Sequence, residues 1–390
     1  MLSALGLSSG AYGETKWIPS LSLSERYDSN VFFAPGSLVP GAKLWDFVTA
    51  ATPSIAVEHK GRPVEGTLTA SASGNVYMNN SGLNYVSTNV GLDLNMNELV
   101  GRLLPGTTLR VTDSFMYTPQ PPAFLTPQLG PGANPYVIGI QAFRANSSSN
   151  SGSVAGTYRW LPSTDLEASY TNSLIRFGST FVSGTQSTLL NSNLQRVTRG
   201  FTFRISARDT TKLLYQYSEA RYEVSPSFTT HGVSVSYTRL LTPSATLMVG
   251  GGPTVVNPGN SLNYTGTASL SWRATQADTL RVLYTRAFAP SFFLTASALV
   301  SNTVTGTVTH QLGERLNLTA SANYAQSESV PTQVLSFRSF GASASVNYQL
   351  TRLISASVAY DYSDFRNQFQ GQSFAFDRNV ATLSLKGSWR

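Results

Sequence analysis

Residues 262–273, LNYTGTASLSWR, alternate between apolar and polar side chains without a break. The even-numbered positions carry Leu, Tyr, Gly, Ala, Leu and Trp, and the odd-numbered positions carry Asn, Thr, Ser and Arg. Successive side chains of a strand point to opposite faces of a sheet, so this segment predicts a strand with one apolar and one hydroxyl-rich face. Runs of about 10 to 14 residues have the length that a tilted strand needs to cross a bilayer.

The same alternation occurs in residues 64–73 and 342–350 and extends along most of the chain. Short turns separate the runs at intervals of roughly 35 to 45 residues, at residues 161–164, 208–210, 242–244, 276–278, 313–314 and 351–352. The connections between them are longer, at residues 28–43, 178–188, 289–299 and 365–373. Short turns at one rim and long loops at the other are typical of outer-membrane barrels, in which the short turns are periplasmic.

These patterns predict an all-β protein, a transmembrane antiparallel up-and-down β-barrel with about 18 strands, within a range of 16 to 20. The even number places both termini in the periplasm, and residues 14–390 are expected to form a single outer-membrane barrel. Residues 1–13 are interpreted as the remnant of a signal peptide or as a flexible N-terminus. Ala11 and Gly13 have the spacing of a signal-peptidase site, although no Lys or Arg precedes them.

The composition excludes several other classes of protein. Charged residues make up 12% of the chain, against roughly 25% in ordinary globular domains, while 41% are hydrophobic. No stretch of about 18 apolar residues is present, which excludes transmembrane helices. The absence of Cys excludes disulfides, iron–sulfur clusters and covalent haem attachment. The net charge of +7 is spread along the chain, so no nucleic-acid partner is expected.

The tryptophans provide an independent indication of a barrel in lipid. Four of the five are predicted to lie on the rim with the short turns, namely Trp17, Trp160, Trp272 and Trp389. Aromatic girdles at both interfaces are expected of such a barrel, and Trp45 is predicted on the opposite rim. A β-propeller, with blades of 40 to 45 residues, is the soluble alternative. It fits less well because two long strands, not four short ones, fill each repeat.

A channel would be lined by the polar face of these strands. The alternation predicts ten charged pore-lining residues, namely Arg110, Arg159, Arg196, Arg204, Arg273, Arg281, Lys386, Glu65, Asp93 and Glu167. Fixed charges set the ion preference of a pore, and the positive excess predicts a weak anion preference. Alternatively, these charges form cross-strand pairs that stiffen a water-filled wall.

The longest connection, residues 119–146, is rich in proline. Proline fixes φ and removes a hydrogen-bond donor, so this segment cannot extend the sheet. It is interpreted either as a constriction or cap of the pore or as a surface loop.

The sequence offers little for catalysis. The three histidines, His59, His231 and His310, are predicted to lie far apart, so no metal site, no bound cofactor and no enzymatic activity are expected. His231 near Ser234 leaves an outer-membrane hydrolase as a remote alternative.

The first hairpin adds a family resemblance. Residues 24–32, SERYDSNVF, followed by Trp45, Asp46, Phe47 and Pro53, resemble the opening of the β-barrel porins of the BBP2 type. That family includes outer-membrane proteins found beside exopolysaccharide and PEP-CTERM loci. The resemblance implies a porin-like channel for hydrophilic solutes in the bacterial outer membrane, in contact with lipid and lipopolysaccharide, that serves polysaccharide export. The alternative is a structural barrel that sheathes or anchors a periplasmic or envelope protein of an export or electron-transfer complex.

Overall fold

The computed structural model describes residues 13–119, 144–180, 189–291, 298–330, 335–369 and 372–389 of the chain. Its described elements are mainly long strands that form one antiparallel sheet: β1 (Glu14–Asp28), β2 (Asp46–Lys60), β3 (Glu65–Tyr77), β4 (Tyr85–Asn95), β5 (Thr107–Thr118), β6 (Ala145–Leu161), β7 (Thr164–Thr180), β8 (Ser192–Arg204), β9 (Asp209–Tyr222), β10 (Phe228–Thr242), β11 (Ala245–Asn257), β12 (Ser261–Arg273), β13 (Asp278–Pro290), β14 (Ala298–Leu312), β15 (Leu316–Val330), β16 (Leu335–Gln349), β17 (Ile354–Phe369) and β18 (Gln372–Ser388). The described helical segments are α1 (Asn97–Leu103), η1 (Gly36–Leu38) and η2 (Ser81–Leu83). None of the helices in these ranges is long and apolar enough to cross a membrane.

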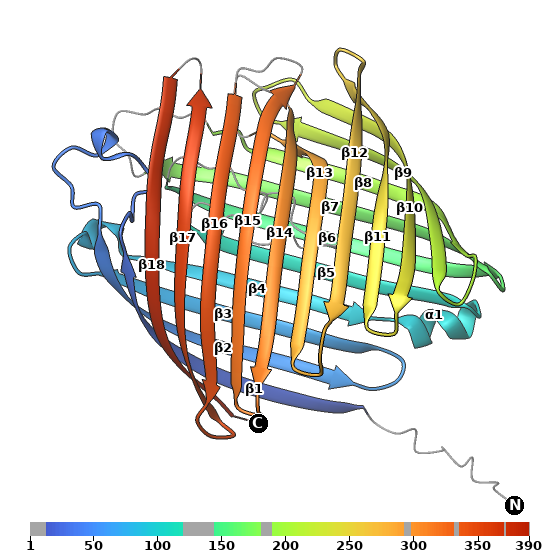
Figure 1. Cartoon of the computed structure of the whole chain (residues 1–390), viewed down its shortest axis with the longest axis horizontal. Helices are drawn as coiled ribbons and strands as arrows, with labels where there is room; N and C mark the ends of the chain where they lie inside the picture. The colour runs from blue at the N-terminus through green and yellow to red at the C-terminus, as the bar shows by residue number, and fades with distance from the viewer. Residues whose placement is uncertain are drawn as a thin grey trace, which may run out of the picture.

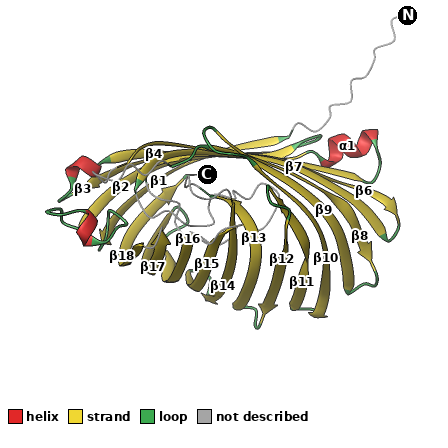
Figure 2. Cartoon of the chain, turned by 90° about the horizontal axis from the view of Figure 1, so that it is seen from above, coloured by secondary structure: helices red, strands yellow, loops and turns green. Residues whose placement is uncertain are grey.

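The sheet closes on itself. Each strand pairs with its neighbour in sequence, and β1 pairs with both β2 and β18, from Ser20 opposite Ser388 to Asp28 opposite Val380. The prediction of a barrel of about 18 strands is therefore confirmed, and a propeller of separate blades is excluded. In Figure 1 the strands β2–β7 of the far wall run across the strands β13–β18 of the near wall, as expected when the strands tilt against the barrel axis. Figure 2 shows that the ring is flattened.

The alternation at residues 262–273 corresponds to β12. Its apolar residues face outward: Leu262, Tyr264 and Trp272 are exposed, and Ala268 lies between Val249 of β11 and Tyr284 of β13. The polar residues of β12 face the interior, beside the polar residues of the adjoining strands. An apolar outer surface and a polar inner surface are what a strand needs to separate lipid from water.

The two rims differ as the sequence predicted. The turn rim carries the connections that lead from an even-numbered to an odd-numbered strand, beginning with β2–β3 and ending with β16–β17. The loop rim carries the connections that lead from an odd-numbered to an even-numbered strand, beginning with β1–β2 and ending with β17–β18. Trp17, Trp160, Trp272 and Trp389 lie exposed on the strand ends at the turn rim, whereas Trp45 lies exposed at the loop rim and packs against Phe47. Tryptophan prefers the depth of the lipid headgroups, so these residues mark the two interfaces.

One expectation about the connections is wrong, and one connection was not predicted. Residues 365–373 are not a long loop, because β17 and β18 stay paired to Phe369 opposite Gln372. The outward side chains here, such as Asp364 and Arg366, are polar, so the apolar alternation stops although the strand continues. The connection between β4 and β5 contains the helix α1, with an ion pair between Glu98 and Arg102 at 2.9 Å, which the turn pattern did not predict.

Some predicted segments lie outside the described residues. These are residues 1–12, most of the proline-rich connection (120–143), and the centres of the connections 178–188 and 289–299.

Gly252 of β11 provides a test of strand packing. A Cβ atom at this position would overlap the carbonyl oxygen of Val233 in β10. We expect Gly252→Ala to lower the free energy of unfolding by about 1–3 kcal/mol, the usual cost of overpacking. Gly306→Ala is the matched control, because no described heavy atom lies within 4 Å of its Cβ position. Urea unfolding in lipid vesicles measures both, and equal midpoints would contradict the expectation.

Candidate functional site: the luminal wall

The inner face of the barrel is lined by hydroxyl groups that bond across the strands. Hydroxyl pairs lie 2.6 Å apart at Ser20–Ser54, Thr108–Thr157, Ser321–Ser343 and Ser357–Ser384. Each residue pairs with a partner on the same face of the sheet, and the side chains next to it in sequence point to the lipid. The wall therefore offers donors and acceptors to water or solute along much of its circumference.

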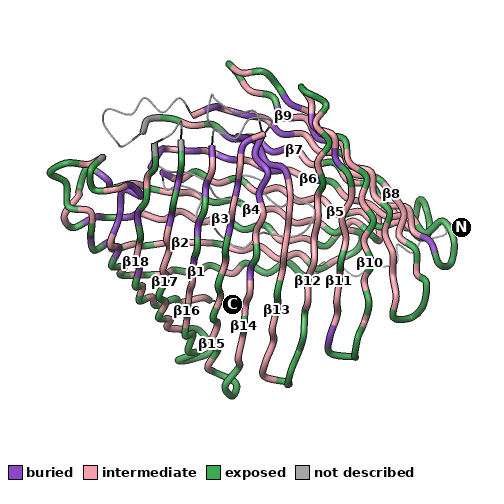
Figure 3. The backbone as a smooth tube through the Cα atoms, turned by 45° about the horizontal axis from the view of Figure 1, so that its top comes forward, coloured by how far each residue is buried: buried purple, intermediate pink, exposed green. Residues whose placement is uncertain are grey.

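The loop-rim end of the lumen is different. Apolar side chains form a buried cluster there that includes Ile175, Leu194, Phe228 and Val256. A second cluster joins Phe33 with Phe365 and Phe376, whose rings stack at 4.8 Å. Figure 3 shows that buried residues gather toward this end of the strands. The wall is thus polar toward the turn rim, whereas buried apolar side chains gather toward the loop rim.

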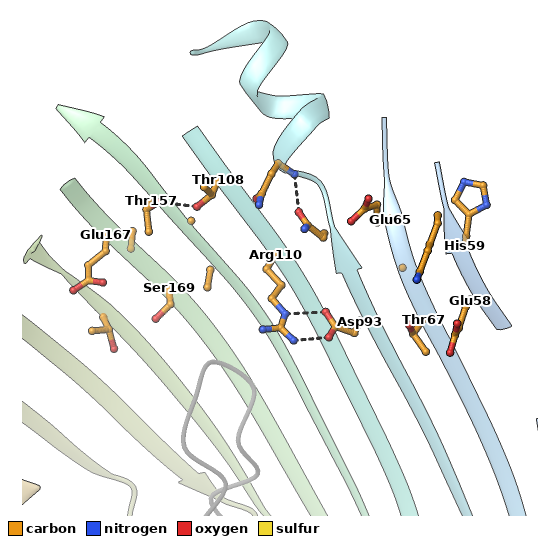
Figure 4. A pocket seen from close by; sticks show the side chains of 18 of the residues that line it. Glu58, His59, Glu65, Thr67, Asp93, Thr108, Arg110, Thr157, Glu167 and Ser169 are labelled. Carbon is orange, nitrogen blue, oxygen red and sulfur yellow. Dashed lines mark hydrogen bonds and ion pairs between the residues drawn. The ribbon is translucent and has the colours of Figure 1, made fainter. Parts of the chain in front are cut away.

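The polar end contains a hollow of about 730 Å³ against strands β2–β9. Carboxylates from four strands line it, namely Glu58, Glu65, Asp93 and Glu167. Figure 4 shows these side chains with Arg110, which holds Asp93 through two parallel bonds of 2.8 and 2.5 Å. A bidentate pair of this kind fixes both side chains and neutralises their charges locally.

The ten predicted residues all lie on the inward-facing register of their strands. Three of the predicted arginines are in ion pairs: Arg110 with Asp93, and both Arg159 and Arg204 with Asp165. Glu167 pairs with Lys212 at 2.9 Å. Arg196 is half-buried, with a shielded Nε that has no hydrogen-bond partner among the described residues. Five of the ten predicted residues thus take part in cross-strand ion pairs.

Besides Arg196, four predicted residues make no ion pair within the described ranges, namely Glu65, Arg273, Arg281 and Lys386. Glu65 lies on β3 and Arg273 on β12, which are nine strands apart in the 18-strand ring and therefore on opposite sides of the lumen. Arg281 is opposite Ser271 in register, next to Arg273 on the inner face. Two unpaired positive charges, Arg273 and Arg281, thus lie side by side across the lumen from Glu65.

The histidines do not converge. His231 faces outward, bonded to the hydroxyl of Tyr215 at 2.9 Å, whereas Ser234 has the opposite parity and faces the lumen. His310 pairs with Asp278 at the turn rim, and His59 bonds to Thr15 there. Within the described residues no cluster of three or more His, Cys, Asp or Glu could hold a metal ion. The sheet itself separates the Ser/His pair that would have favoured a hydrolase.

Residues 263–387 match the family described as "Putative beta-barrel porin 2". The resemblance to BBP2-type porins is confirmed. The match covers β12 to β18, whereas the residues that carried the resemblance in the sequence lie in the first hairpin, outside the matched range.

Solved structures are similar to this chain over most of its length. OpdK of Pseudomonas aeruginosa is 12% identical, covering 96% of this chain and 99% of that chain with a TM-score of 0.49. OpdQ of the same organism is 11% identical, with 96% and 98% covered and a TM-score of 0.48. OccAB3 of Acinetobacter baumannii is 11% identical, with 96% and 99% covered and a TM-score of 0.45. No curated protein sequence matches the chain.

One luminal residue of this barrel was not predicted from the sequence. Asp165 of β7 binds two of the predicted arginines from the neighbouring strands β6 and β8. It has the same parity as Glu167, which was predicted, so the alternation alone was sufficient to find it.

Proposed function

We propose that this chain is a passive channel of the bacterial outer membrane, with no enzymatic activity, for small hydrophilic solutes. The observation that carries the proposal is the contrast between the two faces of the wall, hydroxyl-rich and charged inside and apolar outside. Barrels of 16 to 18 strands enclose more space than their own side chains fill, so a polar inner face holds water. The short turns and both termini would then face the periplasm.

Saccharides are the solutes that we favour. The hydroxyl ladders can exchange hydrogen bonds with a sliding sugar at many weak sites, which supports passage without tight binding. Passage of polysaccharide remains part of this proposal, as does contact of the outer face with lipid and lipopolysaccharide.

We further propose a mild preference for anions. Arg273, Arg281 and Lys386 make no ion pair among the described residues, and arginine stays charged at every relevant pH. Charges in a water-filled pore are screened over about 8 Å at physiological ionic strength, so the preference should weaken in concentrated salt.

Single-channel recording in planar bilayers tests both parts. We expect the wild-type barrel to conduct and to show an anion-selective reversal potential under a KCl gradient. The triple variant Arg273→Gln, Arg281→Gln and Lys386→Gln should shift this potential toward cation selectivity. Arg286→Gln is the matched control on the strand that carries Arg281, because Arg286 faces outward and stacks on Tyr264 at 4.2 Å.

Three outcomes would contradict the proposal. A cation-selective wild-type channel would show that these cations do not dominate the pore. If Arg286→Gln shifts the reversal potential as much as the triple variant does, the selectivity does not come from the charges of the inner face. A barrel that never conducts and that copurifies with a stoichiometric envelope protein would favour the sheath instead.

A further inference from the structure

The outer face is not uniformly apolar. Near the middle of most strands it carries residues such as Leu21, Ile55, Val249, Leu270 and Leu383. On the four consecutive strands β5 to β8 the outward register also includes the polar residues Asp113, Asn150, Asn172 and Arg199. Asp113, Asn172 and Arg199 lie near the middle of β5, β7 and β8, between residues that face lipid.

Side-chain contacts show that these groups point outward. Asp113 accepts hydrogen bonds from Asn150 Nδ2 at 3.0 and 3.2 Å, and its carboxylate lies over Gly152, 3.0 Å from where a Cβ would be. The guanidinium of Arg199 lies 5.3 Å from the ring centroid of Tyr215, which is also on the outer face. Asp113 is half-buried and Arg199 is exposed. Both side chains therefore still present part of their polar surface to the surroundings of the barrel, despite the hydrogen bonds and the stacking.

Contact between these polar side chains and the hydrocarbon of the bilayer costs free energy. A cationic side chain on the lipid face of a barrel costs about 2–4 kcal/mol at the bilayer midplane, and an acidic one costs less. A protein surface of opposite charge over this region would remove that cost. The required surface is already on the chain, because Asp113 and Arg199 carry opposite charges.

The positions of the two charges fit a two-fold axis. Asp113 on β5 and Arg199 on β8 lie equally far from the line between β6 and β7, and both are about midway along their strands. A two-fold interface places the same patch of each copy against itself, so a group on one side of the axis meets the group on the other side. Asp113 of each copy would then meet Arg199 of the second copy.

The centre of this patch suits close approach. Val154 of β6 and Tyr170 of β7 are opposite each other in register, and both are exposed. Gly152, Gly156 and Ala168 surround them on the same face and leave few protrusions. The wall that includes β4–β7 is flat in Figure 2, whereas the wall of β10–β18 bows outward.

We propose that the barrel forms a two-fold dimer through the outer faces of β5–β8, with Val154 and Tyr170 at the axis and two Asp113–Arg199 ion pairs between copies. Each copy keeps its own lumen, so the proposal is independent of the conduction proposed above.

A charge swap tests the pairing in the purified full-length protein. The mass of the protein–detergent complex, measured by sedimentation, should show a dimer for the wild type. Asp113→Arg or Arg199→Asp alone places like charges together, and each should weaken dimerisation by about tenfold or more, which corresponds to about 1.4 kcal/mol. The double variant should restore it. Arg286→Asp, on the outer face of β13, is the control that should leave the dimer unchanged.

Cross-linking tests the location of the axis independently of the charge variants. The chain contains no Cys, so a single Val154→Cys provides a unique reactive group. A short bismaleimide should link two copies of this variant in lipid vesicles, whereas Leu270→Cys on β12 should stay unlinked.

The proposal is overturned if the wild type is monomeric at every concentration. A monomer that binds lipopolysaccharide over this face would overturn it as well. It is also overturned by a trimer, or by a double variant that stays dissociated while it remains folded by heat-modifiable electrophoresis. If the charge variants do not fold, absence of the Val154→Cys cross-link overturns it.

Discussion

Replacing Asp28 with alanine is expected to lower the free energy of unfolding by about 3–5 kcal/mol, the usual cost of removing one partner of a buried ion pair. Asp28 ends β1, and its carboxylate binds Arg378 of β18 at 2.9 and 2.6 Å. The Asp28 side chain is 1% exposed and that of Arg378 is 14% exposed. Loss of the carboxylate leaves a shielded guanidinium without its counter-charge at the junction that closes the ring.

Asp364→Ala is the matched control for Asp28→Ala. Asp364 pairs with Arg366 at 3.1 Å on the outer face, where the arginine side chain is 72% exposed. Exposed pairs contribute about 0–1 kcal/mol, so this variant should unfold almost as the wild type does. Urea unfolding in vesicles, followed by tryptophan fluorescence, compares the two. Equal midpoints would mean that the buried pair does not stabilise the closure.

Replacing Arg144 with alanine is the second change with a large expected effect, about 3 kcal/mol or more. The buried guanidinium of Arg144 donates to the carbonyl oxygens of Val31 and Leu83 and to the Tyr77 hydroxyl, at 3.3, 2.9 and 3.0 Å. It also lies 4.9 Å from the ring centroid of Tyr77. Alanine leaves three acceptors without this donor, and each unsatisfied buried group costs about 1–3 kcal/mol.

The geometry of the guanidinium gives this prediction a graded test. Arg144→Lys keeps the charge but not the planar fork, so its unfolding midpoint should fall between those of the wild type and of Arg144→Ala. Arg239→Ala is the control, because Arg239 is exposed at the turn rim and lies 3.9 Å from Asp209. If Arg144→Ala unfolds at the same urea concentration as Arg239→Ala, the contacts of Arg144 carry no net stability.

The architecture could be predicted because lipid imposes a strict pattern. Where a strand crosses the bilayer, as in β12, every second side chain must be apolar, and strand length and orientation follow from the alternation. The pattern fails beyond the lipid. At Asp364 and Arg366 the outward residues meet water, so a strand and a polar loop have the same composition there.

The luminal site was only partly predictable. Parity places Arg110 and Asp93 on the inner face, but their pairing depends on the register of β4 against β5, across a connection that forms α1. Arg144 lies outside any alternation, and its contacts with Val31 and Leu83 join segments far apart in sequence. Asp113 and Arg199 did not stand out as charges in the sequence, because only the register shows that both face lipid.

The contact between Asp28 and Arg378 joins residues 350 positions apart. The ring therefore cannot close until its last strand exists, and a sheet that lacks this strand has two free edges. Free edges expose unpaired backbone groups that recruit other strands and promote aggregation. Pairing of β1 with β18 also closes the longest loop in the chain, so this step is expected to be slow. The cell must keep such a chain apart from its neighbours until the two ends meet.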